Sequence, residues 1–284
     1  MCKSIPKIRQ LPSTTVLNKK ITILGRLMKK LLITLLTLGM FNVALADDHS
    51  PTWRGVNMAE NFAVQFEVCA LKPGKTLADV ERLDARIKAI WAKLDIDLSF
   101  LRLSPMYSAT MPGQPSTDYI NLIMGNISAL GAGWDSWSAS AEGPKILRDV
   151  NKIADCRFKF GRGINKMIDT AALDSTDNRI MTMNWCEPKD GVSYDQLKAK
   201  HDSWLAANGD SFTAAAWNIV DPRQGAGTRQ GKFMHLVSYT SASALMANEN
   251  WIANGGGWKG VQDYLTSYAD CEGESAWTAE YLIK

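Results

Sequence analysis

The chain has 284 residues, of which 46% are hydrophobic and 21% are charged, and its formal net charge at pH 7 is +3. Residues 1–46 contain eight of the 32 basic residues and none of the 29 acidic ones, which leaves 24 basic against 29 acidic residues from Asp47 onward. The chain from Asp47 onward is mildly acidic and has no excess of basic residues to attract phosphate backbones or anionic lipid. We therefore expect no nucleic-acid partner.

The N-terminal segment has the pattern of a secretory signal. Met28 and two lysines precede an apolar run from Leu31 to Val43, and the small residues Ala44 and Ala46 follow. The run is shorter than the roughly 20 apolar residues that a membrane-spanning helix needs, so we expect no membrane span after processing. We predict translation from Met28, cleavage after Ala46 and a periplasmic or secreted protein, with residues 1–46 an upstream extension plus signal peptide.

Cleavage after Ala46 would leave Asp47-Asp48-His49 at the new N-terminus. A free amine with histidine in third place can wrap Cu(II) or Ni(II) in a square plane, so His49 is a candidate metal ligand. A flexible acidic leader is the favoured alternative. The chain has only three histidines, and we predict no other metal site.

Four cysteines follow the signal, namely Cys69, Cys156, Cys186 and Cys271. An even number of cysteines in an exported chain favours disulfides over buried thiols.

The chain from residue 47 onward contains an internal repeat. The segments that begin at Cys69 and Cys186 both fit the pattern C-x-x-K-x-G-x-[ST], at an offset of 117 residues. The second cysteines lie 115 residues apart, and Trp137 and Trp251 lie 114 apart. Anchors in register at a fixed period indicate a duplication, so we predict one repeat over residues 47–172 and a second over 173–284.

Each repeat has the same order of expected elements. Alternating apolar positions predict first strands over residues 61–69 and 179–186. Capping boxes at Thr76 and Ser193 predict that a helix follows each strand. Two strands come next, over 98–103 and 119–124 in the first repeat and 214–220 and 233–239 in the second. A glycine-interrupted helical stretch and a last strand complete a β-α-β-β-α-β, or ferredoxin-like, unit of the α+β class.

This topology predicts the cysteine pairing. The first and last strands of the unit lie side by side and antiparallel, so the end of the first meets the start of the last. Cys69 and Cys156 occupy those places in one repeat, and Cys186 and Cys271 occupy them in the other. These are the pairs that the topology brings within disulfide reach.

A tandem of ferredoxin-like units resembles the dimeric α/β-barrel superfamily, and the paired cysteine motif resembles an uncharacterised secreted branch of it. The resemblance covers residues 61–284 and implies two four-stranded sheets that pack face to face around a cavity. The superfamily contains cofactor-independent monooxygenases, isomerases and haem proteins such as chlorite dismutases and dye-decolourising peroxidases. Fold alone therefore implies no single chemistry.

The polar residues on the strands provide the candidate site. If the alternate set that includes Glu67 and Cys69 faces the cavity, a group of ligand-binding candidates converges there. His235 is the candidate for proton transfer, because its ordinary pKa lies near neutrality. The alternative is that these side chains face solvent or bond to the backbone. The ligand-binding candidates are Glu67, Arg102, Asn121, Asn184, Trp217 and Asn218.

We expect a monomer or homodimer that binds a small apolar or aromatic molecule between the two sheets and uses no cofactor. The alternative is a cofactor-independent monooxygenase-like or isomerase-like enzyme that uses His235, and the sequence does not decide whether the protein is an enzyme. His201 lies on the apolar stripe of a predicted helix and is a candidate ligand for non-covalent haem, although a packed histidine is the more frequent case.

Overall fold

The computed structural model describes residues 52–108 and 116–284, which belong to one compact unit. The signal sequence, its cleavage site and His49 lie outside these residues. None of the described helices is both long and apolar enough to cross a membrane.

Two β-α-β-β-α-β units follow one another along the chain, which confirms the predicted ferredoxin-like repeats. The first consists of β3 (Phe62–Leu71), α2 (Leu77–Glu81), α3 (Asp84–Leu94), β4 (Ser99–Tyr107), β5 (Tyr119–Gly125), α4 (Ile127–Ala139), α5 (Gly143–Ile153) and β6 (Ala154–Ile168). The second consists of β7 (Asn178–Pro188), α7 (Tyr194–Asn208), β8 (Ala216–Pro222), β9 (Phe233–Tyr239), α8 (Ala242–Asn254), α9 (Trp258–Ser267) and β10 (Ala269–Ile283).

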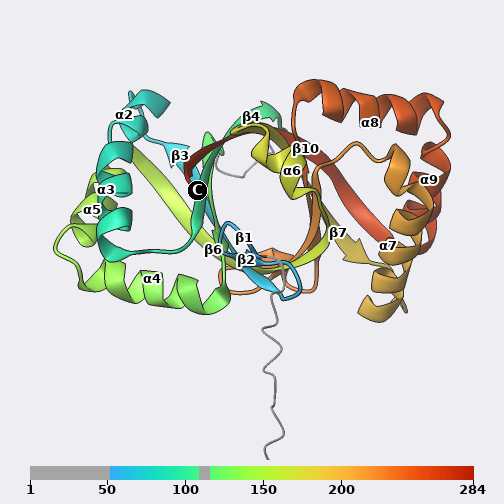
Figure 1. Cartoon of the computed structure of the whole chain (residues 1–284), viewed down its shortest axis with the longest axis horizontal. Coiled ribbons are helices and arrows are strands. Elements are labelled where there is room, and N and C mark those ends of the chain that lie inside the picture. Colours follow the sequence, from blue (N-terminus) through green and yellow to red (C-terminus); the bar gives the residue numbers. More distant parts are fainter. Residues whose placement is uncertain (1–51, 109–115) are drawn as a thin grey trace, which may run out of the picture. The chain divides into compact units, whose positions relative to one another are not determined.

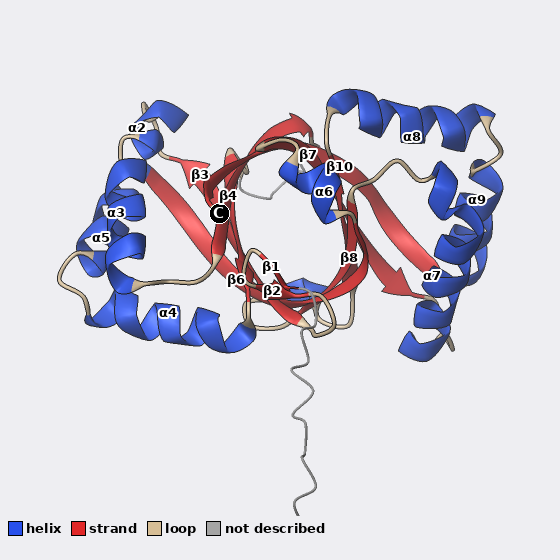
Figure 2. Ribbon diagram, in the orientation of Figure 1, coloured by secondary structure: helices blue, strands red, loops and turns tan. Residues whose placement is uncertain are grey.

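The two units share one closed barrel of eight antiparallel strands, in the order β10-β4-β5-β3-β6-β8-β9-β7. Closure depends on the last strand of each unit, which has 15 residues and pairs on both edges. Strand β6 pairs with β3 of its own unit and β8 of the other, and β10 pairs with β7 and β4. Helices α2 to α5 cover one side of the barrel and α7 to α9 the opposite side (Figures 1 and 2).

The backbone of β6 contains glycine at two positions where interior side chains lie against it. A Cβ atom at Gly163 would lie 2.3 Å from the ring of Phe62 and one at Gly161 would lie 2.6 Å from Val220. Any other residue would therefore displace an interior side chain, which explains glycine at these two positions.

Both predicted disulfides are confirmed. Cys69 faces Cys156 in the β3–β6 ladder, and Cys186 faces Cys271 in the β7–β10 ladder. The Cα atoms of the two pairs are 4.1 and 4.0 Å apart. The capping boxes at Thr76 and Ser193 are also present. The helix expected after Thr76 is divided into α2 and α3.

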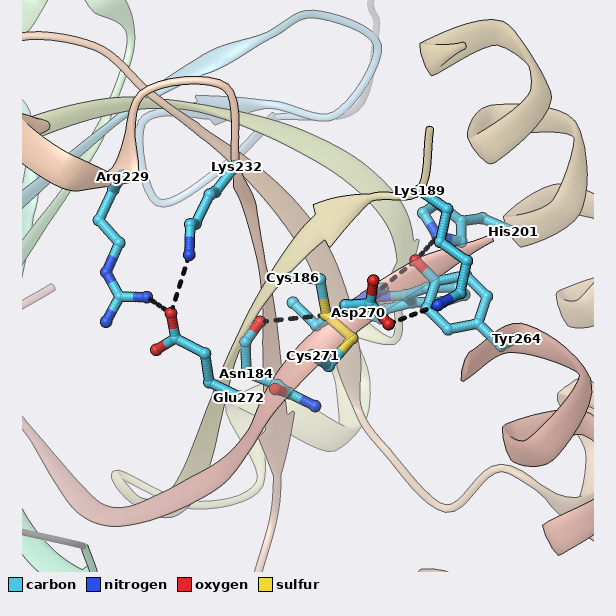
Figure 3. Close-up of a disulfide and its surroundings, with 12 residues drawn as sticks. Asn184, Cys186, Lys189, His201, Arg229, Lys232, Tyr264, Asp270, Cys271 and Glu272 are labelled. Carbon is cyan, nitrogen blue, oxygen red and sulfur yellow. Dashed lines mark hydrogen bonds and ion pairs between the residues drawn. A yellow bond between two sulfur atoms is a disulfide. The ribbon is translucent and has the colours of Figure 1, made fainter. Parts of the chain in front are cut away.

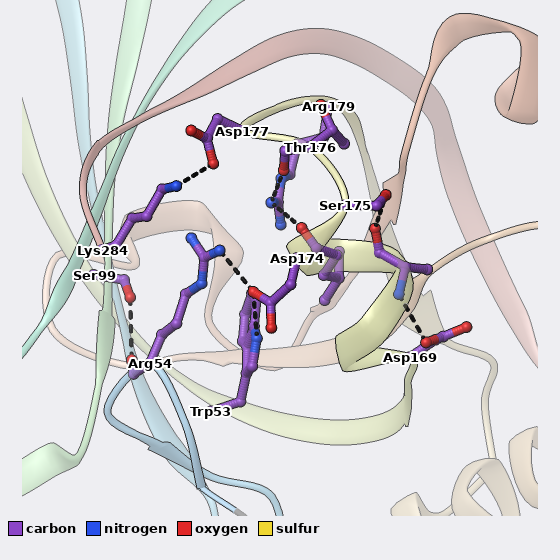
Figure 4. A network of polar contacts seen from close by, with 12 residues as sticks. Trp53, Arg54, Ser99, Asp169, Asp174, Ser175, Thr176, Asp177, Arg179 and Lys284 are labelled. Atoms are coloured by element: carbon purple, nitrogen blue, oxygen red, sulfur yellow. Dashed lines mark hydrogen bonds and ion pairs between the residues drawn. The ribbon is translucent and has the colours of Figure 1, made fainter.

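One end of the barrel is closed by two short elements that the sequence did not predict, the hairpin β1 (Thr52–Trp53) with β2 (Val56–Asn57) and the helix α6 (Thr170–Asp174). Asp174 joins them, because it accepts hydrogen bonds from Trp53 Nε1 at 3.1 Å and from the Arg54 guanidinium at 2.7 Å (Figure 4). Arg54 also lies over the ring of Tyr281, 4.2 Å from its centroid. Elements of two to five residues are too short to show a hydrophobic period, so they could not be predicted from the sequence.

The barrel interior is filled by the strand positions opposite to those predicted. Phe62, Val64 and Phe66 of β3 pack in one apolar cluster with interior residues of both units. The alternate set, with Ala63 and the polar side chains up to Glu67, faces the helices of the first unit. Residues 62–66 of β3 are all buried, so both faces are covered, and alternation could not distinguish the inner face from the outer one.

Candidate functional site

A cavity with a volume of about 640 Å³ lies inside the barrel, at the end where both disulfides are. First strands β3 and β7 end here, and last strands β6 and β10 begin here. Its walls contain aromatic, aliphatic and methionine side chains from both units. The apolar lining residues are Phe66, Val68, Ile120, Phe160, Met183, Trp185, Val220, Met234 and Trp277.

Cations surround the mouth of this barrel cavity. Arg157 and Lys159 extend from β6, and Arg229 comes from the turn between β8 and β9. Arg229 lies over the Trp185 ring. It also forms an ion pair with Glu272 (Figure 3).

The two β6 cations have no such neutralising partner. Lys159 donates to the carbonyl of Gly225 at 3.0 Å, and neither Arg157 nor Lys159 has a carboxylate within 4.0 Å among the described residues. Partial burial, together with the charges of Arg157 and Arg229, lowers the pKa of Lys159. The mouth therefore has an excess of positive charge beside an apolar cavity.

A second cavity, of about 80 Å³, lies between the sheet and the helices of the first unit. Its walls are apolar and rich in aromatic rings, and Glu67 is the only charged residue in them. The Glu67 carboxylate accepts hydrogen bonds from Gln65 Nε2 at 3.1 Å and Asn121 Nδ2 at 2.9 Å. Gln65 is held in turn by Trp134 Nε1, which donates to its Oε1 at 2.7 Å.

The buried side chain of Arg102 extends the hydrogen-bonded group that contains Glu67. Its Nε donates to Asn121 Oδ1 at 3.2 Å, and another guanidinium nitrogen lies 2.8 Å from Asp84 at the start of α3. Burial raises the pKa of Glu67, while the hydrogen bonds from Asn121 and Gln65 and the charge of Arg102 oppose the rise. Desolvation is the largest of these effects, so Glu67 binds a proton more readily than an ordinary glutamate.

In the second unit the corresponding space contains a chain of hydrogen bonds. Trp217 Nε1 donates to His235 Nδ1 at 3.0 Å, so the neutral His235 ring carries its proton on Nε2. That nitrogen lies 3.2 Å from the hydroxyl of Tyr264, which lies 2.9 Å from His201 Nε2. His235 therefore donates to Tyr264, and Tyr264 donates to His201.

Both histidines are neutral in this arrangement. Burial, followed by the charge of Lys166, lowers the pKa of His201 to about 4. Burial, followed by the proximity of His201, lowers the pKa of His235 to about 3. Aromatic rings fill the space around them: the His201 ring centroid lies 5.3 Å from that of Trp217 and 5.5 Å from that of Tyr264. Neither histidine lines the two cavities described above.

The predicted candidates therefore form separate groups on opposite sides of the barrel. Glu67, Arg102 and Asn121 lie together under the helices of the first unit. Trp217, His235 and its strand neighbour Asn184 lie in the second unit, and Asn218 lines a small cavity of about 30 Å³ near the closed end. The expectation that Glu67, Asn184 and His235 line one common cavity is wrong, because the polar strand positions face outward toward the helices.

The sequence reasoning missed the cations of β6. The last strand was predicted only as an element, without residues assigned to its faces. The alternation of Arg157 and Lys159 with Phe158 and Phe160 was the available signal, since it places two cations on one face of a strand.

The described histidines do not fit a haem. Both nitrogens of His235 are engaged, His201 Nε2 is bonded to Tyr264, and the two rings pack against each other and against Trp217 rather than against a cavity. Ligation of iron would require these hydrogen bonds to break and the aromatic packing to open.

Comparisons with known proteins find no matching family model and no matching curated protein. Among solved structures, a dye-decolorizing peroxidase from Bacteroides thetaiotaomicron is similar, with a TM-score of 0.50 and 9% identity over 78% of this chain and 93% of that one. A candidate monooxygenase from Lactobacillus acidophilus has a TM-score of 0.47 and 12% identity, over 78% and 95% of the two chains. A candidate chlorite dismutase has a TM-score of 0.46 and 10% identity, over 77% and 94%.

Identities this low show likeness of fold and leave the activity open. The first of these similarities agrees with the duplicated β-α-β-β-α-β units and their shared eight-stranded barrel. The chain therefore has the fold of the dimeric α/β-barrel superfamily.

Proposed function

We propose that the protein binds a small apolar or aromatic molecule inside the barrel, between the sheets of its two repeats. The observation that supports this function is the barrel cavity of about 640 Å³, which lies within the size range of small-molecule sites. Its apolar walls would gain free energy by exchanging water for an apolar ligand.

The composition of the walls suits ligands of varied shape. Met183 and Met234 lie at the inner surface of the cavity, and the unbranched methionine side chain adapts to irregular surfaces. Trp185 and Trp277 add flat aromatic faces against which a ring or chain can pack.

Replacement of Val68 by tryptophan tests this proposal. Val68 is partly buried and lines the barrel cavity, so the larger ring of Val68→Trp would occupy space that a ligand needs. We expect the affinity for the neutral fluorescent probe N-phenyl-1-naphthylamine to fall by about tenfold or more, equivalent to about 1.4 kcal/mol.

The control is Val261→Trp, which changes an exposed residue of α9 in the same way and should leave the affinity unchanged. Fluorescence titration of the three proteins supplies the measurement. Equal affinities of wild type and Val68→Trp would place the probe elsewhere and contradict the proposal.

A second function, proton transfer without a cofactor, is favoured by Glu67. His235 was the candidate from sequence, but Glu67 has a cavity beside it and a raised pKa, which are the properties of a general acid or base. The chemistry would be proton removal from, or delivery to, a carbon atom of a small aromatic substrate, as in an isomerase-like reaction.

Deuterium exchange tests this second function. Small aromatic ketones with acidic C–H bonds beside the carbonyl are incubated with the protein in D₂O, and loss of the C–H signal is followed by proton NMR. We expect exchange that Glu67→Gln slows by about 100-fold, at the low end of what a positioned acid–base group contributes. Glu81→Gln, on the exposed face of α2, is the matched control. Unchanged exchange in Glu67→Gln would exclude Glu67 as the acid or base.

We also propose that the protein acts outside the cytoplasm. The two disulfides support an oxidising compartment, because such bonds are rare in a reducing cytosol. The signal-like segment that ends at Ala46 supports the same conclusion from the sequence.

A further inference from the structure

The barrel cavity combines an apolar interior with a charged mouth, and the charge is unbalanced. Arg229 and Lys232 share the carboxylate of Glu272, from which Lys232 Nζ lies 3.2 Å away. Within residues 52–108 and 116–284, the two cations on β6 have no such carboxylate partner: Lys159 bonds to a carbonyl, and Arg157 is exposed at the rim.

The positions of Arg157 and Lys159 follow from the register of β6. Arg157 is the partner of Val68 and Lys159 is the partner of Phe66 in the β3–β6 ladder. Val68 and Phe66 both line the barrel cavity, so the two cations project on the same side of the sheet as its apolar wall. A cation beside a low-dielectric wall is attracted to an anion more strongly than one in open water.

We infer that the ligand of the barrel cavity is an amphipathic anion, with its anionic group bound by Arg157 and Lys159 and its apolar part directed toward Met183 and Met234. This inference rests on the proposed function, to which it adds the chemical class and the orientation of the ligand. The lowered pKa of Lys159 supports it, because crowding by Arg157 and Arg229 would be relieved by an anion.

Glu274 also lines the barrel cavity, and this acidic residue limits how much negative charge a ligand of the cavity can carry. Three cations and two acids line it, namely Arg157, Lys159, Arg229, Glu272 and Glu274. Burial, followed by the charge of Glu249, raises the pKa of Glu274, so this residue is less readily ionised than an ordinary glutamate. The lining therefore keeps an excess of positive charge, which favours an anion and disfavours a cation.

Decanoate and decanol are the probes that test the inference, since they share an apolar chain and differ in charge. Binding is measured by isothermal titration calorimetry with wild type, with Arg157→Met/Lys159→Met, and with the control Lys88→Met/Lys93→Met. The control changes two exposed lysines of α3 and therefore alters the net charge equally. We expect the β6 double variant to weaken decanoate binding by about tenfold or more, while decanol binding changes less than about twofold. The control should bind both probes like wild type.

Two results would overturn the inference in different ways. If the β6 double variant binds decanoate like wild type and decanol still binds, no anion is recognised, although the proposed apolar site stands. If wild type binds neither probe, the proposed function itself is wrong. Decanol binding also reports folding of the variant; if it is lost in the double variant, Arg157→Met and Lys159→Met are tested singly against the same criterion.

Discussion

Replacement of Arg102 by methionine is expected to lower the free energy of unfolding by about 3–5 kcal/mol, the scale for breaking one side of a buried ion pair. The Arg102 side chain is 5% exposed and that of its partner Asp84 is 15% exposed. Arg102→Met would leave the Asp84 carboxylate unpaired under the helices and would remove the donor to Asn121 Oδ1. Urea denaturation followed by circular dichroism measures the loss.

Arg162→Met is the matched control, because Arg162 also pairs with an aspartate in the barrel but is 42% exposed. An exposed pair is worth up to about 1 kcal/mol, so this variant should lose far less. The double variant Arg102→Met/Asp84→Leu should recover most of the loss, since no buried charge would remain. If Arg102→Met is no less stable than Arg162→Met, the buried network around Glu67 does not hold the sheet to α3 as described.

The free energy of unfolding is expected to fall between pH 7 and 5, which is well above the pH at which ordinary carboxylates are protonated. His201 and His235 have folded-state pKa values of about 4 and about 3, whereas an unfolded histidine titrates near 6.5. As pH falls below about 6.5 the unfolded chain gains these protons and the folded chain does not, so stability is lost down to the folded pKa values. Between pH 7 and 5 the loss should be about 1.5–2 kcal/mol for each histidine.

The comparison that isolates this effect uses His201→Gln/His235→Gln, because glutamine does not titrate. Glu67 acts in the opposite direction, since its raised pKa favours the folded state at lower pH, and it contributes equally to both proteins. Unfolding free energies measured in urea at pH 7, 6 and 5 should therefore fall by about 3 kcal/mol more in wild type than in the variant. Parallel pH dependence in the two proteins would show that these histidines are not buried in neutral form.

The sequence predicted the features that depend on local pattern. The order of the strands and the capping boxes are encoded in spacings of a few residues, and the repeat is encoded in a motif that recurs at a nearly constant offset. The pairing of Cys69 with Cys156 then followed from topology, because neighbouring strands of the unit bring their ends together.

The orientation of the site could not be predicted in the same way. The barrel has two apolar layers, one inside it and one beneath the helices, and residues 62–66 of β3 touch both. Alternation shows that a strand has two faces, but here both faces are buried and either could be the inner one. Glu67 and His235 were therefore assigned to the wrong side of the sheet, although Asn121 does lie beside Glu67 and Trp217 beside His235.

The closure of the barrel could not be predicted from the sequence pattern either. The length of β6 and its pairing with β8 of the other unit are long-range features that no local spacing encodes. Arg157 and Lys159 lie in the part of β6 that pairs with β3 of the same unit. The last strand of the first repeat was predicted without assigning its residues to either face of the sheet, which explains why these cations were overlooked.

Methyl NMR of the protein with N-phenyl-1-naphthylamine tests the central claim, a ligand site inside the barrel, most directly. Met183 and Met234 line the cavity, whereas Met246 is an exposed residue of α8 and serves as the internal reference. With ¹³C-labelled methionine methyls, we expect shifts and probe-to-methyl NOEs at Met183 and Met234 and none at Met246. A probe that binds without affecting Met183 or Met234 would contradict the account and place the ligand site outside the barrel.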